Sequence, residues 1–233
     1  MYKDCKILSL IPARGGSKGI KNKNITNLNG RPLISYSIET ALGSKYIDDI
    51  VVSTDSEEIA AVSIKYGAAV PFMRPKELAS DEARTIDAVL HAINALEKKY
   101  DVLVLLQPTQ PLRTIEEVDC AIESFFKNKM KGLVSVSRVK DHPLMIRTLN
   151  SDGSLTSLIR ENSTCRRQDM RIYYKVNGCI YINKISELSE YTSFNDNEMG
   201  FVMEEDHAVD IDTQLDLHLA EYYIENTNKS RFN

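Results

Sequence analysis

The first group of residues suited to chemistry is a basic glycine loop that directly follows an apolar run. Residues 6–11 (KILSLI), a run rich in Leu and Ile, are bounded by Pro12, which is typical of a short buried strand. No acidic residue stands between Asp4 and Glu39. Glycines let a chain turn sharply and bring bare N–H groups close to a ligand. The residues of interest are Arg14, Gly15, Gly16, Ser17, Lys18, Lys23 and Asn24.

This composition favours a polyphosphate ligand, because the charge of the loop is entirely of one sign. The loop matches neither GxxxxGK[ST] nor GxGxxG, so the two standard phosphate fingerprints do not apply. A plain glycine turn with solvated lysines would have the same composition.

Two carboxylates near the other end of the chain are the second candidate. Asp210 and Asp212 alternate with Val209 and Ile211. On a strand, both carboxylates would lie on one face, roughly 7 Å apart along the chain. Facing a triphosphate, they would hold Mg²⁺, which binds a few carboxylates together with waters and substrate phosphates. The alternative is a half-buried strand whose wet side is acidic.

The elements that must position these residues follow from the alternation of apolar runs and amphipathic segments. Strands are predicted at residues 6–11, 49–53, 68–72 and 102–106, and helices at 33–44, 56–66, 85–98 and from 114. This order predicts an α/β fold: a mostly parallel, Rossmann-like twisted sheet with helices on both faces. Ligands of such sheets bind outside the carboxyl ends of the strands. The loops that begin at Pro12, Thr54 and Gln107 should therefore meet in one crevice.

The pattern changes after Gly132. Strands are predicted at 133–137, 144–150, 154–159 and 176–182, with Ser151-Asp152-Gly153 as a hairpin turn. We expect one nucleotidyltransferase domain over residues 1–233, with a small antiparallel insertion at about 138–176. A strand at 209–212 and a helix from 214 to about 224 should close the chain.

Composition excludes several classes of function. The chain has 233 residues, of which 42% are hydrophobic and 27% charged, as in ordinary globular proteins. A net charge of −4 argues against a general nucleic-acid binder. No apolar run approaches the roughly 18 residues that cross a bilayer. The four cysteines and four histidines show no metal-binding spacing. We expect a cytoplasmic protein with free thiols that binds neither nucleic acid nor membrane.

Several separated motifs, in order, resemble the CMP-sugar synthetases, the cytidylyltransferases that activate sialic acid and related acidic sugars. The motifs are IPARGGSKGIKNKN with LNGRPLI, RPKELASDEART, LLQPTQPLR, RRQD with VNGCIYI, and DIDTQLDL. The resemblance covers residues 7–219. It implies CTP and an acidic nine-carbon sugar as substrates, Mg²⁺ as cofactor, and a homodimer formed through the insertion.

The resemblance also implies a role for each candidate residue. Arg167 and Gln107 would orient the sugar, with Arg167 gripping its carboxylate, and Asn177 lies in a matching strand. Nucleotide-binding residues would be the basic-loop residues named above together with Arg74 and Thr85. Asp210 and Asp212 would bind Mg²⁺, and one of them would accept the hydroxyl proton. The catalytic residues would be Arg14, Lys18, Asp210 and Asp212. Ordinary turn chemistry is the alternative for the RPKELASDEART and LLQPTQPLR loops, and an exposed basic turn for Arg166-Arg167.

The identity of the acceptor stays open. His142-Pro143-Leu144 is followed by Met145, where the sialic acid branch often has a lysine. This difference leaves room for a related sugar such as legionaminic acid beside N-acetylneuraminic acid. The same chemistry on 3-deoxy-manno-octulosonate or pseudaminic acid is an alternative. A nucleotide-binding module without catalysis is an alternative of another class.

Overall fold

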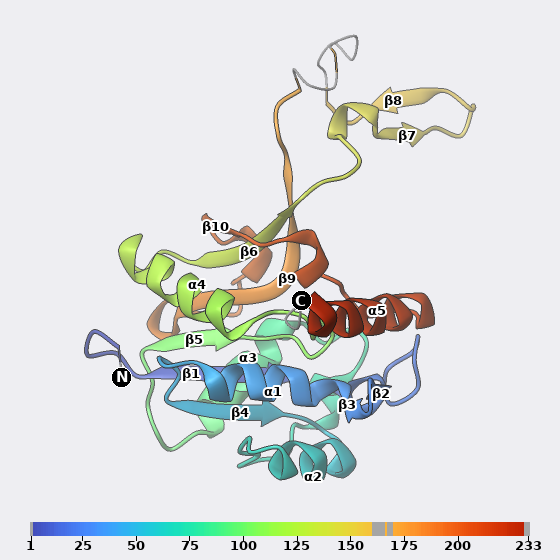
Figure 1. Ribbon diagram of the computed structural model, residues 1–233. Coiled ribbons are helices and arrows are strands. Elements are labelled where there is room, and N and C mark those ends of the chain that lie inside the picture. Colours follow the sequence, from blue (N-terminus) through green and yellow to red (C-terminus); the bar gives the residue numbers. More distant parts are fainter. Residues whose placement is uncertain (1, 160–165, 167–169, 231–233) are drawn as a thin grey trace.

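A six-stranded sheet in the order β10-β6-β9-β5-β1-β4 forms the centre of the protein (Figure 1). The computed structural model describes residues 2–159, 166 and 170–230, with side chains as far as 226. All strands of this sheet run in one direction except β9, which is antiparallel to both of its neighbours. The strands are β1 (Ile7–Pro12), β4 (Asp49–Ser53), β5 (Val102–Leu105), β6 (Leu133–Arg138), β9 (Tyr174–Lys184) and β10 (Met199–Val202).

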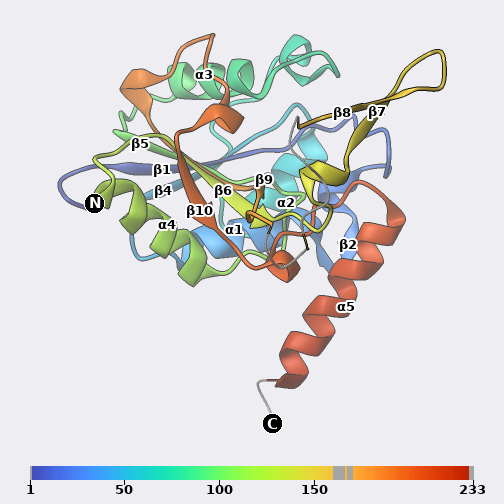
Figure 2. The ribbon, with the colours of Figure 1, turned by 90° about the horizontal axis from the view of Figure 1, so that it is seen from above.

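Helices cover both faces of the sheet, as predicted. In Figure 2, α3 (Thr85–Ala95) lies on one side of the strands, and α1 (Leu33–Gly43) and α4 (Ile115–Lys127) lie on the other. Successive β1 residues are buried in opposite cores: Ile7 packs in the cluster with α1 and α4, and Leu8 in the cluster with α3. This period of two is what a strand buried on both faces requires. The mixed, mostly parallel α/β fold is confirmed.

Helix starts are fixed by side-chain caps at the carboxyl edge of the sheet. The Thr114 hydroxyl accepts from the Glu117 amide at 3.1 Å, and the Glu117 carboxylate accepts from the Thr114 amide at 2.8 Å. This is the capping box that T-x-x-E predicts. Ser56 caps α2 (Glu57–Lys65) in the same way, accepting from the Ile59 amide. The loops before these helices therefore leave the sheet at defined points.

A third, smaller apolar cluster joins the basic loop to the C-terminal part of the chain. Ile20 and Leu28 pack with Ile211 and with α5 (Gln214–Ser230). The short hairpin of β2 (Asn27–Leu28) and β3 (Arg31–Pro32) shapes this loop. Its turn residues Asn29 and Gly30 have φ of 49° and 83°, the left-handed conformation that the Asn-Gly pair favours. The hairpin was not predicted.

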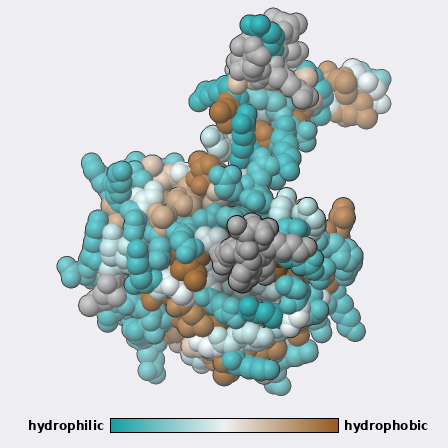
Figure 3. Space-filling view, viewed as in Figure 1, coloured by the Kyte–Doolittle hydropathy of each residue, from teal (hydrophilic) through white to brown (hydrophobic). Residues whose placement is uncertain are grey.

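A hairpin arm projects from the body of the molecule (Figure 1). It consists of β7 (Arg147–Leu149) and β8 (Leu155–Ser157), paired antiparallel around Gly153 as the turn signal predicts. Figure 3 shows hydrophobic surface on this arm, and the side chains of Leu149, Leu155 and Leu158 are exposed.

Single turns of 3₁₀ helix complete the described structure. They are η1 (Lys23–Ile25), η2 (Lys76–Ala79), η3 (Pro143–Met145), η5 (Ile185–Glu187), η6 (Phe194–Asp196) and η7 (Glu205–His207). Within the described residues, no helix combines the length and apolar character that crossing a membrane requires.

Four predictions about elements are wrong. The strand at 68–72 is reduced to one bridge between Val51 and Ala69. The predicted strand at 144–150 begins with the turn η3, and the third helix ends at Ala95 rather than at 98. Apart from these wrong predictions, the strand β10 was missed. The segment 209–212 is not a strand, because its neighbour is a loop: the Ile211 amide donates to the Thr109 carbonyl at 2.9 Å.

Candidate functional site

A polar hollow of about 430 Å³ lies at the carboxyl edge of the sheet. The loops after β1 and β5 both reach it, together with the segment between α2 and α3 and the residues just before α5, whereas the loop that begins at Thr54 is not among its lining residues. Its walls include most of the residues singled out from the sequence, which are Arg14, Ser17, Lys18, Lys23, Asn24, Arg74, Thr85, Gln107 and Asp212. Gly15, Gly16, Asn177 and Asp210 are not among its lining residues. Arg167 lies outside the described residues.

The basic loop and the Asp212 segment meet directly. Lys23 Nζ lies 2.8 Å from Asp212 Oδ1, although the two residues are 189 positions apart. The Lys23 side chain is 15% exposed, whereas that of Asp212 is 72% exposed and open to the hollow. Gly19 also approaches this segment, since a Cβ on Gly19 would lie only 2.5 Å from the Asp212 carbonyl oxygen. Two distant parts of the sequence thus share one surface.

Asp210 is close to this hollow but opens onto another. It lines a neighbouring cavity of about 680 Å³ at the base of the arm. The Asp210 carboxylate accepts a hydrogen bond from Thr109. Thr109 also lines the first hollow, so it connects Asp210 to that hollow. Although part of the Asp210 side chain reaches solvent, burial among its neighbours raises its pKa, and the negative charge of Asp212 adds to the rise.

Asp210 and Asp212 are the two carboxylates that could hold Mg²⁺ in this region. No cluster of three or more His, Cys, Asp or Glu side chains suited to a metal occurs in the described part of the chain. Mg²⁺ needs only one or two carboxylates when waters and substrate phosphates complete its shell. Burial raises the pKa of Asp210, the negative charge of Asp212 adds to the rise, and a cation bound near both carboxylates would oppose it.

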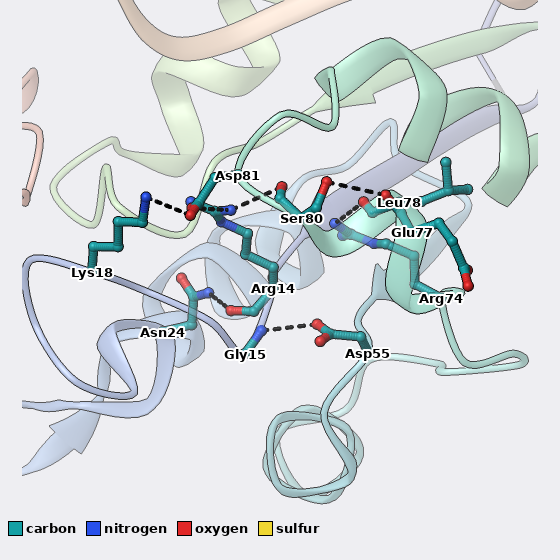
Figure 4. A network of polar contacts seen from close by, with 10 residues as sticks. All are labelled: Arg14, Gly15, Lys18, Asn24, Asp55, Arg74, Glu77, Leu78, Ser80 and Asp81. Carbon is teal, nitrogen blue, oxygen red and sulfur yellow. Dashed lines mark hydrogen bonds and ion pairs between the residues drawn. The ribbon is translucent and has the colours of Figure 1, made fainter.

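Arg14 and Lys18 point into the hollow from the basic loop, and both contact Asp81 (Figure 4). Arg14 Nη1 lies 2.8 Å from Asp81 Oδ1, and Lys18 Nζ lies 2.6 Å from Asp81 Oδ2. Arg14 also donates to the Ser80 carbonyl at 2.9 Å. These cations, with Lys18 contributing most, lower the pKa of Asp81. Asp81 was not among the predicted site residues, because nothing in the sequence around it indicates that it pairs with the basic loop more than sixty residues away.

Hydrogen bonds from Asn24 and to Asp55 hold the backbone of the basic loop. Asn24 is buried, and its amide donates to the Arg14 carbonyl at 2.9 Å. The Gly15 amide donates to Asp55 Oδ1 at 2.9 Å, so in this structure it is paired within the protein. Gly16 has open space around it. Asn24 and Asp55 therefore fix the turn from which Arg14 and Lys18 extend.

The side chain of Arg74 is buried beside Ser53, the last residue of β4. Its Nε donates to Ser53 Oγ at 3.0 Å, its Nη2 donates to the Ser53 carbonyl, and its own amide donates to the Thr54 carbonyl at 2.7 Å. Burial lowers the pKa of Arg74. These bonds fix one wall of the hollow, and Thr85, the first residue of α3, forms part of the same wall.

A second hollow of about 350 Å³ adjoins the first. Arg84, Thr85 and Gln107 line both hollows, so the two form a continuous surface. Tyr181 and Phe194 add aromatic surface to the second one. Gln107 stands at the junction, where a side-chain amide can both donate and accept hydrogen bonds.

The loop that carries Gln107 is held by Arg113, whose role was not predicted. Arg113 Nη1 donates to Ser37 Oγ at 2.8 Å and its Nη2 donates to the Gln107 carbonyl. The guanidinium is buried, and no carboxylate of the described residues lies within ion-pair distance. Burial lowers the pKa of Arg113 to about 10. The sequence signal was present, because Arg113 ends the LLQPTQPLR motif.

Asn177 supports the site from inside the sheet. Its Oδ1 accepts from Ser135 Oγ at 2.6 Å and from the Cys179 amide at 3.1 Å. These bonds hold an irregularity in β9 at Gly178, whose φ is 79°. A Cβ on Gly178 would lie 3.5 Å from Gln107 Oε1. Asn177 therefore shapes the strand beside Gln107, with its side-chain oxygen already bonded within the protein.

The fold and the site together define a nucleotide-binding α/β protein, with a basic loop and carboxylates at the carboxyl edge of its sheet. Comparison with family models narrows this class. The model described as "Cytidylyltransferase" matches residues 8–229. The chain belongs to the cytidylyltransferase family and is a CTP-dependent nucleotidyltransferase.

Three similar proteins match over almost their whole length. The post-translational flagellin modification protein B of Campylobacter coli is 38% identical over 228 residues, covering 96% of this chain and 97% of that protein. The CMP-N,N'-diacetyllegionaminic acid synthase of Legionella pneumophila is 37% identical, with 94% and 97% covered. A pseudaminic acid cytidylyltransferase of Campylobacter jejuni is 36% identical, with 97% and 100% covered.

Among solved structures, CMP:2-keto-3-deoxy-manno-octonic acid synthetase complexed with CTP has a similar fold. Its TM-score is 0.73 at 17% sequence identity, with 95% of this chain and 99% of that chain covered. Because this likeness covers nearly the whole chain at low sequence identity, it supports the fold independently of the sequence motifs.

Proposed function

We propose that this protein transfers the cytidylyl group of CTP to a sialic-acid-like nine-carbon sugar, giving a CMP-sugar and pyrophosphate. The names of relatives at 36–37% identity support an acidic sugar of this kind as acceptor. One observation carries the proposal: the 2.8 Å contact between Lys23 and Asp212 brings the basic loop and a carboxylate to one hollow. A cytidylyltransferase needs both at the triphosphate.

In this proposal the basic loop binds the triphosphate. Arg14, Ser17, Lys18 and Lys23 line the first hollow and supply charge and a hydroxyl donor. Arg74 and Thr85 form the wall on which the cytidine would lie. Asn24 acts indirectly, because its amide holds the carbonyl of Arg14. Positioning and electrostatic stabilisation of this kind supply most of the rate enhancement in phosphoryl-type transfers.

The sugar would occupy the second hollow, with Gln107 at the junction facing both substrates. Aromatic surface beside polar groups suits a sugar ring that carries N-acyl substituents. Arg167 remains our proposed partner for the sugar carboxylate, on the strength of its RRQ motif. We propose that Asn177 helps by holding the strand next to Gln107.

The reaction is an in-line displacement at the α-phosphorus. The anomeric hydroxyl of the sugar attacks, the bond to the bridging oxygen breaks, and pyrophosphate leaves with its electron pair. Asp210 or Asp212 accepts the hydroxyl proton, and burial raises the pKa of Asp210, as suits a group that accepts a proton. Both aspartates would hold Mg²⁺, which when bound neutralises negative charge on the phosphates.

The acceptor that we favour is legionaminic acid or N-acetylneuraminic acid. A test mixes the protein with CTP, Mg²⁺ and each of these sugars, beside pseudaminic acid and 3-deoxy-manno-octulosonate, and measures pyrophosphate release. Replacing CTP with UTP is the control for specificity toward the cytosine of the nucleotide. Turnover with one nonulosonic acid supports the proposal, and no turnover with any of them contradicts it. Tight CTP binding that survives Asp212→Asn, together with no turnover by the wild type, would favour a non-catalytic module.

We further propose a homodimer in the cytoplasm, where CTP is available. The arm supports this assembly, because Leu149 and Leu155 are 74% and 64% exposed on a projecting hairpin and exposed apolar patches commonly mark interfaces. The free thiols of Cys5, Cys120 and Cys179 fit a reducing compartment. Light scattering should give twice the chain mass for the wild type and a lower mass for the double variant Leu149→Ser, Leu155→Ser. A monomeric wild type would contradict the dimer.

Arg113→Met should impair sugar use more than folding. Among the described residues its buried guanidinium has no carboxylate partner, so methionine removes a buried charge without leaving an unpaired carboxylate behind. The Gln107 carbonyl, however, loses a donor. We expect the KM of the sugar to rise about tenfold, equivalent to about 1.4 kcal/mol, while the melting temperature changes by only a few degrees. An unchanged KM would show that Arg113 does not position Gln107.

A further inference from the structure

The Asp81 carboxylate stands between Arg14 and Lys18, two cations of the basic loop (Figure 4). One of its oxygens lies 2.8 Å from Arg14 Nη1, and the other lies 2.6 Å from Lys18 Nζ. The neighbouring Ser80 carbonyl accepts a second bond from Arg14 at 2.9 Å. The segment between η2 and α3 thus supplies an anion to the groups that the proposed function assigns to the triphosphate.

A carboxylate that bridges two cations imitates a phosphate group. Both present paired anionic oxygens to N–H donors, and Arg and Lys bind either group. Because Asp81 belongs to the same chain, its effective concentration at this position is high. The contact is nevertheless weak enough to break: the Asp81 side chain is 42% exposed and that of Lys18 is 79% exposed, and exposed ion pairs are worth little.

We propose that Asp81 is an internal competitor for polyphosphate. Its carboxylate occupies the position between Arg14 and Lys18 when the site is empty, and it must leave when a triphosphate binds. It returns when pyrophosphate leaves, so that the two cations are never without an anion. This inference rests on the proposed function, because it takes the basic loop as the triphosphate site. Asp81 would lower the affinity for CTP and for pyrophosphate alike, and it would favour product release.

The test compares Asp81→Asn with Glu82→Gln. Asparagine keeps the shape and removes the charge. Glu82 is the matched control, because it is an exposed acid one position further along. Calorimetry would give the Kd of pyrophosphate for the wild type and both variants, and steady-state kinetics would give the KM of CTP and the inhibition constant of pyrophosphate.

We expect Asp81→Asn to lower the Kd of pyrophosphate about threefold to tenfold, as the loss of two exposed ion pairs predicts. The KM of CTP and the inhibition constant of pyrophosphate should fall by a similar factor, with Glu82→Gln close to wild type. Weaker or unchanged pyrophosphate binding by Asp81→Asn, or equal tightening by Glu82→Gln, would overturn the inference.

Failure of the inference is distinguishable from failure of the proposed function. If the wild type consumes CTP with a nonulosonic acid but Asp81→Asn leaves pyrophosphate binding unchanged, only the competitor role fails. If no sugar supports turnover but Asp81→Asn binds pyrophosphate more tightly, the competitor role stands as a property of the anion site and the proposed reaction fails.

Discussion

Replacing Asp212 with asparagine is expected to lower kcat/KM for CTP by roughly 10²–10³-fold, the usual loss when one preorganised electrostatic group is removed from a transition state. Asp212 is the carboxylate that the fold brings to the basic loop, 2.8 Å from Lys23. It is also a proposed Mg²⁺ ligand, so the Mg²⁺ concentration that gives half-maximal rate should rise about 10–100-fold. Pyrophosphate release measured across a Mg²⁺ titration separates these two effects.

Asp216→Asn is the matched control for this prediction. Asp216 is a neighbouring acid, but its carboxylate is used at the start of α5, where it accepts from the Thr213 amide at 2.7 Å and from the Asp212 amide at 3.2 Å. Its loss should reduce stability by about 1 kcal/mol, as for a helix cap, and leave the Mg²⁺ requirement unchanged. Wild-type activity in Asp212→Asn would remove this residue from the metal site. Wild-type activity in Asp210→Asn would remove Asp210 alone.

The fold could be predicted because its pattern is local. A strand buried on both faces reads as an apolar run, and β1 and β5 do so. The T-x-x-E box marks the first turn of α4 whatever surrounds it. Once strands and helices alternate, the rule that ligands bind at the carboxyl edge brings the loops after β1 and β5 together, and the first hollow lies there.

The features that could not be predicted depend on tertiary contacts, which no local sequence pattern encodes. The alternation around Ile211 correctly separates buried from exposed residues, but it predicted a strand because it cannot say that the neighbour is a loop. The pairing of Asp81 with Lys18 joins two loops that are unrelated in sequence. Arg113 looks like any surface arginine until the fold buries it. A motif can mark such residues, but only the tertiary structure gives their partners.

Gly19→Ala should lower kcat/KM roughly 10²-fold although it changes no charged or reacting group. A Cβ at this position would lie 2.5 Å from the Asp212 carbonyl oxygen, which belongs to the backbone and has no rotamer with which to move away. The basic loop or the segment before α5 must therefore shift, and Lys23 and Asp212 separate. A displacement of about 1 Å in a catalytic arrangement can cost two orders of magnitude. Overpacking of this kind should also cost about 1–3 kcal/mol of stability.

Gly200, on the edge strand β10, serves as the control in Gly200→Ala, because the added Cβ would make an ordinary 3.5 Å contact with Val136 of β6. We expect that variant to keep wild-type kcat/KM and pyrophosphate affinity. In Gly19→Ala, both quantities should fall at temperatures where circular dichroism and the melting curve show a folded protein. If Gly19→Ala is folded and fully active, the basic loop and the Asp212 segment need not touch during catalysis. The reacting phosphate would then be positioned by the walls of the hollow rather than by the meeting of these two segments.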